Sequence, residues 1–105
     1  MASQSDYVLL LEAEWDRPEG FMAKLREGVL DRQGFLRTIA ILREIETLKL
    51  QSLDRRLVSL IWYIPLFMSW QEGRVASVGG AKEREQLVLM SNDVLAILEQ
   101  ILGIP

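Results

Sequence analysis

The sequence predicts an all-α fold, a compact single-domain bundle of four to five helices whose central apolar helix is kinked near Pro65. Three observations support this class. Apolar residues recur at steps of three and four along most of the chain, which is the period of an amphipathic helix. No second convincing strand is present, and a lone strand would leave its backbone groups unpaired. The 105 residues are 50% hydrophobic and 26% charged, an ordinary composition for one globular domain.

The segment 3–14 fits two secondary structures. Ser3 and Asp6 match the spacing of a capping box at the start of a helix, and the apolar residues that follow keep helical spacing. Against this, apolar and acidic residues alternate from Leu11 to Asp16, which is the period of a strand. Because no partner strand exists for it, the helix is favoured.

Two amphipathic helices are expected next. The first begins at Pro18, whose missing N–H is not needed at the first helical position, and ends near Gly34 after a weak point at Gly28. The second runs over residues 35–50. Its buried stripe is expected to contain Phe35, Leu36, Ile39, Leu42, Ile45 and Leu48.

A fourth helix, starting at Ser52 or Asp54, is expected to be the central one. From Leu57 to Trp70 it carries no charged residue, and a helix that is apolar nearly all round is normally surrounded by others. Pro65 removes its own N–H and crowds the preceding turn, so a kink or a split into two shorter helices is expected there.

The segment 71–81 contains three glycines and reads as the one long flexible loop of the domain 1–105. It does not match a phosphate-binding loop, because Ala81 separates the last glycine from Lys82 and Glu83 replaces the required hydroxyl. A last helix is expected from Lys82 to Gly103, unless Ser91–Asp93 begins it afresh. Its buried positions would be Leu87, Met90, Val94, Ile97 and Ile101.

The composition excludes several kinds of chemistry. The chain has no Cys and no His, which removes thiolate catalysis, disulfides, Cys-based metal sites and the commonest general base. The longest apolar run, Leu60 to Met68, has nine residues and is too short to cross a bilayer, and the first residues lack the pattern of a secretory signal. We therefore expect a cytoplasmic protein that is not an enzyme, needs no cofactor and does not bind membranes.

The net charge of −3 is unevenly distributed. Residues 1–20 carry five carboxylates and one arginine, residues 21–60 have a basic excess of three, and residues 61–105 have an acidic excess of two. A protein that binds nucleic acid usually carries a basic excess on one face. An acidic chain of this kind is not expected to bind nucleic acid.

An acidic cluster, formed by Glu12, Glu14, Asp16 and Glu19, is the most concentrated chemical feature. Three interpretations stay open: a solvated helix end, a patch that docks on a basic groove of a partner, and a site for a hard cation. The spacing matches no EF-hand, so the first two are favoured over the metal.

Aromatic residues bracket Pro65, namely Trp62, Tyr63, Phe67 and Trp70. Trp62 and Trp70 are eight positions apart, so an unbroken helix sets them about 80° from each other. An aromatic stripe at helical spacing is usually part of the core, and the alternative is a ligand pocket or an exposed binding anchor.

The functional class favoured by these features is a non-catalytic protein-interaction domain. We expect a small acidic protein that occupies a basic site on a partner, as an immunity protein, antitoxin-like inhibitor or adaptor would. The alternatives are a helical subunit of a homodimer or larger assembly, and a small-molecule binder around Pro65. No metal or cofactor is expected, and the candidate partner-binding residues are Glu12, Glu14, Asp16, Glu19, Trp62 and Trp70.

Overall fold

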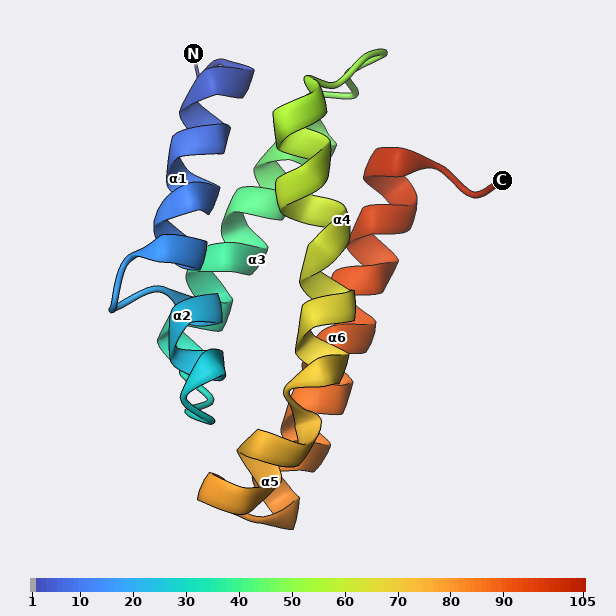
Figure 1. The fold of residues 1–105 in the computed structure, drawn as a ribbon. Helices are drawn as coiled ribbons and strands as arrows, with labels where there is room; N and C mark the ends of the chain where they lie inside the picture. The colour runs from blue at the N-terminus through green and yellow to red at the C-terminus, as the bar shows by residue number, and fades with distance from the viewer. Residues whose placement is uncertain (1) are drawn as a thin grey trace.

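The computed structural model describes residues 2–105, and these form six helices and no strand (Figure 1). The helices are α1 (Gln4–Asp16), α2 (Phe21–Arg26), α3 (Arg32–Thr47), α4 (Arg55–Trp70), α5 (Glu72–Gly79) and α6 (Ala81–Leu102). The all-α class is thereby confirmed.

The helix α1 forms where the sequence left a strand as the alternative. Ser3 and Asp6 close the capping box, with the Ser3 backbone N–H donating to Asp6 Oδ2 at 2.8 Å. This reciprocal arrangement satisfies two backbone N–H groups that a helix start would otherwise leave unpaired. Tyr7, Leu11 and Trp15 then enter the core, at the spacing of one helical face.

The second expected helix is much shorter than the sequence indicates. It begins at Phe21 rather than Pro18 and ends at Arg26, because Gly28 adopts φ of +79° and turns the chain toward α3. The helix α3 then begins at Arg32, before the expected residue 35. Its core face also differs from the expected stripe, since Leu36 is exposed and Ile41 is buried in its place.

The segment expected to be a flexible loop contains the helix α5, so the prediction of a loop over 71–81 is corrected. Val75 is fully buried, and Arg74 donates a hydrogen bond to the carbonyl oxygen of Arg26 at the end of α2. These tertiary contacts hold the segment helical despite its glycines, which is how packing commonly overrides propensity. The chain then turns at Gly80, where φ is +90°, and α6 continues to Leu102 without a second start at Ser91–Asp93.

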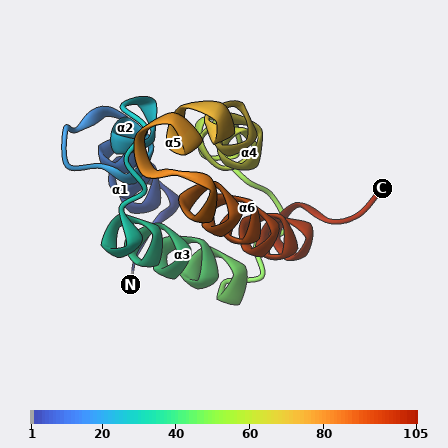
Figure 2. The same ribbon diagram turned by 90° about the horizontal axis from the view of Figure 1, so that it is seen from below.

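The helix α4 runs through Pro65 without splitting. The helices α1, α2, α5 and α6 contact it, but Trp62, Leu66 and Trp70 stay exposed on its remaining side. Figure 2 shows α3 and α4 on opposite sides of the molecule, with α6 between them. The molecule extends 41 × 30 × 19 Å. A thickness of 19 Å holds two helices of about 10 Å each, so no helix in this slab can be covered on all sides. This is why one face of α4 stays exposed.

No helix within residues 2–105 has both the length and the apolar character that crossing a bilayer requires.

Candidate interaction surface

Exposed apolar side chains gather on the α4 and α6 side of the molecule. Among residues 2–105, 13 large hydrophobic side chains are exposed, and six of them, leaving out Leu89, lie on α4 and α6, two helices that pack against each other. Scattered single hydrophobic residues are ordinary on a protein surface, whereas a contiguous group indicates an interaction site. The six residues are Trp62, Leu66, Trp70, Val88, Leu95 and Leu102.

On α4 these residues form a ridge, which we call the α4 ridge and define as Val58, Trp62, Leu66 and Trp70. They lie four positions apart, so they follow one row along the helix surface. The side chain of Trp62 is 46% exposed and that of Trp70 is 58% exposed. From Leu57 to Trp70 no charged residue interrupts this helix.

The two exposed tryptophans are held in place by Tyr63. The Tyr63 ring makes edge-to-face contacts with Trp62 at 5.2 Å and with Trp70 at 5.5 Å between ring centroids. Tyr63 itself stands 6.2 Å from the buried Trp15, whose indole N–H donates to the carbonyl oxygen of Leu60 at 3.1 Å. Aromatic pairs of this geometry contribute about 0.5–1.5 kcal/mol each. Tyr63 therefore anchors the two tryptophans to the core. Because their side chains are already ordered before a partner binds, little side-chain entropy is lost on binding.

The polar side chains on the same face of α4 turn back onto their own helix. Ser59 Oγ donates to the carbonyl oxygen of Arg56, and Ser69 Oγ donates to that of Leu66, both at 2.7 Å. Because both hydroxyl groups already donate hydrogen bonds within the helix, a binding partner does not need to supply an acceptor for them. The face therefore presents a mostly apolar surface to whatever covers it.

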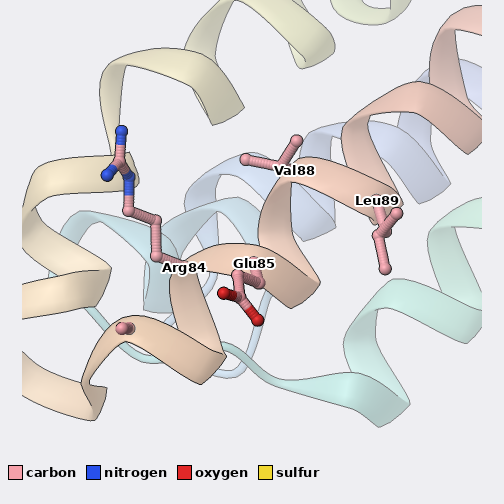
Figure 3. A pocket seen from close by; sticks show the side chains of 5 residues that line it. Arg84, Glu85, Val88 and Leu89 are labelled. Atoms are coloured by element: carbon pink, nitrogen blue, oxygen red, sulfur yellow. The ribbon is translucent and has the colours of Figure 1, made fainter.

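A second row continues this surface on α6. Val88, Leu95 and Leu102, which we call the α6 row, are seven positions apart and share one side of the helix. The other side of α6 meets α3, where Asp93, Ala96 and Gln100 border a hollow with Arg43 and Glu46. Figure 3 shows Val88 pointing toward the side of α4 and α5, and Leu95 and Leu102 follow it at seven-residue steps.

Figure 3 shows the start of the α6 row, in a shallow hollow of about 370 Å³. Arg84 and Val88 point toward the side of α4 and α5, while Leu89 points the other way. Arg84 is paired with Glu72 of α5 at 3.4 Å, so the charge at this end of the surface is neutralised within the molecule.

The acidic cluster does not form one exposed patch. Glu14 is only 7% exposed and acts as a structural group between α1, α2 and α3. Its Oε1 accepts a hydrogen bond from the backbone N–H of Phe21 at 2.9 Å, and its Oε2 accepts one from Arg37 Nε at 3.0 Å. The hydrogen bonds to Glu14 raise the pKa of Arg37 above its ordinary value. Glu14 is thus withdrawn from any binding surface.

The other three acids separate as well. Glu12 pairs with Arg56 of α4 at 2.8 Å, which neutralises it within the molecule. Asp16, the last residue of α1, and Glu19 in the turn that follows are exposed, with the exposed Arg17 between them. Within the described part of the chain, no three acidic side chains converge on a point that could hold a metal ion.

Pro65, around which a small-molecule pocket was one expectation, is buried among the core side chains. The hollow in Figure 3 lies on the outer surface of α6, not at this proline. The candidate residues Trp62 and Trp70 are brought onto one face, whereas the acids are dispersed.

Sequence reasoning did not single out Leu66 or the α6 row. One signal was available for each. Leu66 is equidistant in sequence from the two tryptophans, and Val88, Leu95 and Leu102 repeat every seven residues beside the core positions Leu87, Val94 and Ile101.

Comparison of this chain with family models, with curated proteins and with solved structures gives no match.

Proposed function

We propose that this chain is a non-catalytic protein-interaction domain whose binding surface is the α4 ridge together with the α6 row. The observation that carries the proposal is the pair of exposed tryptophans on an uncharged helix face, both fixed by Tyr63. Tryptophan and tyrosine are enriched among the residues that dominate binding energy at protein interfaces. Exposing them without a partner leaves a large apolar area in water.

The proposal places binding on an apolar surface instead of the acidic cluster. Two of the four acids are engaged within the fold, Glu14 with Arg37 and Glu12 with Arg56, so only part of the charge near the N-terminus remains for steering a basic partner. Exposed ion pairs and rim charges influence association rates more than affinity. Asp16 and Glu19 are assigned that secondary role here.

Site-specific photo-crosslinking in cells that express the chain tests the proposal. Benzoylphenylalanine is placed at Leu66, in the middle of the α4 ridge, and at Leu36 in a control protein. Leu36 is 58% exposed on α3, and Figure 2 shows α3 on the opposite side of the molecule from α4. We expect a defined protein adduct from position 66 and none from position 36. Equal labelling at the two positions, or no adduct at position 66, would contradict a binding surface on α4.

A further inference from the structure

We infer that residues 48–54, between α3 and α4, form a lid over a cavity at one end of the bundle, and that Gln4 is the latch that keeps this lid closed. Figure 1 shows the loop at the same end of the molecule as the start of α1. The lid shares no residue with the α4 ridge or the α6 row, so it goes beyond the proposed function. Four features lead to it: the contacts of Gln4, the scarcity of other contacts, the cavity beneath the loop, and the backbone of Lys49.

The side chain of Gln4 holds the loop through both polar atoms of its amide. Gln4 Nε2 donates to the carbonyl oxygen of Ser52 at 3.2 Å, and Gln4 Oε1 accepts from the backbone N–H of Asp54 at 2.7 Å. The partners are 48 and 50 positions away in the sequence. The two bonds satisfy one carbonyl and one N–H of a loop that has no regular secondary structure to pair them.

Gln4 is the fixed side of this contact. It is the first residue of α1 and directly follows Ser3, whose capping box with Asp6 fixes the start of the helix. The Gln4 side chain is partly buried, although the residues on either side of it are exposed. Ordering a long side chain costs rotamer entropy, so it stays in one place only where its contacts offset that loss. The start of α1 therefore presents the amide to the loop from a rigid position.

The loop has few other attachments. Among residues 2–105, the two bonds of Gln4 are the only hydrogen bonds that join the backbone of 50–54 to α1, α3 or α6. Gln51 and Ser52 are exposed, and Leu50 and Leu53 are only partly buried. Segments with few buried apolar contacts and exposed backbone open at a lower free energy than the core does. The latch is thus a large part of what keeps this loop in place.

The packing beneath the loop is incomplete. A cavity of about 30 Å³, with room for a water molecule, lies under Leu50 and Leu53. Side chains that border such a space lose part of the dispersion contacts of a close-packed core, so the apolar attachment of the lid is weak. The other residues that line the cavity are Ile45, Glu46 and Lys49 on one side and Gln100 and Ile101 of α6 on the other.

Lys49 supplies a hinge at the start of the lid. Its φ of 50° is in the left-handed region, directly after the last residue of the α3 cap, Leu48. Glycine or asparagine is usual at this position, because a side chain with a Cβ atom is strained there. Rotation about Lys49 opens the loop and releases this strain. The backbone therefore favours opening, and the contacts of Gln4 oppose it.

Thiol labelling of the purified full chain tests the lid. The chain has no cysteine, so a single introduced thiol is the only reactive group. Ile45→Cys reports opening of the lid, because Ile45 lines the cavity and is 2% exposed. Leu87→Cys, at a fully buried position of α6, reports unfolding of the core. With excess aromatic disulfide reagent, we expect the thiol at position 45 to react at least about a hundredfold faster than the thiol at position 87. Low urea concentrations should hardly change the rate at position 45, because opening a short loop exposes little surface, and should raise the rate at position 87 steeply.

Substitutions of Gln4 in the Ile45→Cys chain test the latch. Gln4→Ala removes both hydrogen bonds and should speed the labelling at position 45 about tenfold, the effect of two net hydrogen bonds. Gln33→Ala makes the same chemical change at the exposed second residue of α3 and should leave the rate unchanged. Gln4→Glu keeps the acceptor for the Asp54 N–H but loses the donor to Ser52, so its rate should lie between those of the parent and Gln4→Ala.

Equal rates and equal urea dependence at positions 45 and 87 would show that only unfolding of the whole chain exposes position 45, and would overturn the lid. A rate at position 45 that Gln4→Ala does not raise, or that Gln33→Ala raises equally, would overturn the latch. Far-UV circular dichroism checks that each variant keeps the fold. Should Gln4→Ala lose it, the milder Gln4→Glu carries the same test.

Discussion

Glu12 and Glu14 show how two neighbouring acids of the same type take different roles. In the sequence they belong to one acidic cluster, and nothing in their spacing separates them. In the fold, Glu14 is buried at the junction of three helices, whereas Glu12 forms an exposed pair with Arg56. The difference arises because the two residues lie on different faces of α1. The apolar pattern around them does not predict that Glu14 is buried and accepts a hydrogen bond from the first residue of α2.

Replacing these two acids should therefore have unequal effects on stability. Glu14→Ala leaves the buried backbone N–H of Phe21 without an acceptor and Arg37 without its partner, so we expect a loss of about 2–3 kcal/mol in the free energy of unfolding. Glu12→Ala removes an exposed pair and should change it by at most about 1 kcal/mol. Urea unfolding of both variants measures the difference, and equal losses would refute the structural role of Glu14.

Asp31, at the start of α3, gives a pH dependence of known sign. Burial opposes the ionisation of its carboxyl, but the hydrogen bond from Lys24 at 3.2 Å and the nearby charges of Lys24 and Arg37 outweigh it and lower the pKa below the ordinary 3.8. A lowered pKa in the folded state contributes stability that is present above that ordinary value and is lost as the pH falls through the folded-state value.

The stability difference between the wild type and Asp31→Asn should therefore be constant at neutral pH and shrink below about pH 4. Urea midpoints measured for both proteins between about pH 7 and pH 3 follow this difference. A difference that grows toward acid pH would show that the carboxyl is not stabilised in its charged form.

At the scale of elements, α5 and α4 show the two ways in which sequence and structure diverge. The glycines of 71–81 indicate a loop, but Val75 reaches the core and the segment packs against the end of α2. The apolar pattern of α4 indicates a central helix, but its neighbours cover only one side. In both cases the prediction from the local pattern was wrong, because tertiary contacts that the pattern does not contain decided the outcome.

The turn that follows α2 packs closely against α5 at Gly28. A Cβ atom at this position would stand 2.6 Å from Val78 Cγ2 and 2.9 Å from the carbonyl oxygen of Arg74, in addition to the strain of φ at +79°. Gly28→Ala should lower the free energy of unfolding by about 2–4 kcal/mol. Val78→Ala alone should cost less than about 0.5 kcal/mol, because Val78 is 61% exposed.

Combining the two substitutions tests the contact directly. Removing the Val78 methyl groups should recover about 1 kcal/mol of the loss caused by Gly28→Ala, while the clash with the Arg74 backbone remains. A double-mutant cycle by urea unfolding measures this coupling. If the two effects simply add, α5 does not pack on Gly28 as described.

Limited trypsin digestion should also report the helical state of α5. Arg74 and Lys82 lie in helices, where the backbone is protected from trypsin. Arg17 is a poor trypsin site because Pro18 follows it. The longest segment between helices is 48–54, where Lys49 has φ of 50°. We expect the first cut after Lys49, giving residues 1–49 and 50–105, because proteases act on backbone that opens locally. A first cut after Arg74 would restore the loop interpretation.

At the scale of the whole molecule, the sequence was sufficient for the all-α class, for the start of α1 at its capping box and for four core positions of α6, whereas the buried Leu98 was not expected and Ile101 is only partly buried. It was insufficient for the binding surface, because exposure depends on how the helices stack. The molecule is only 19 Å thick, which leaves one face of α4 uncovered. The periodicity of a single helix cannot predict this thickness. Trp62 and Trp70 were found among the candidates, while Leu66 between them and the α6 row emerged only from the packing.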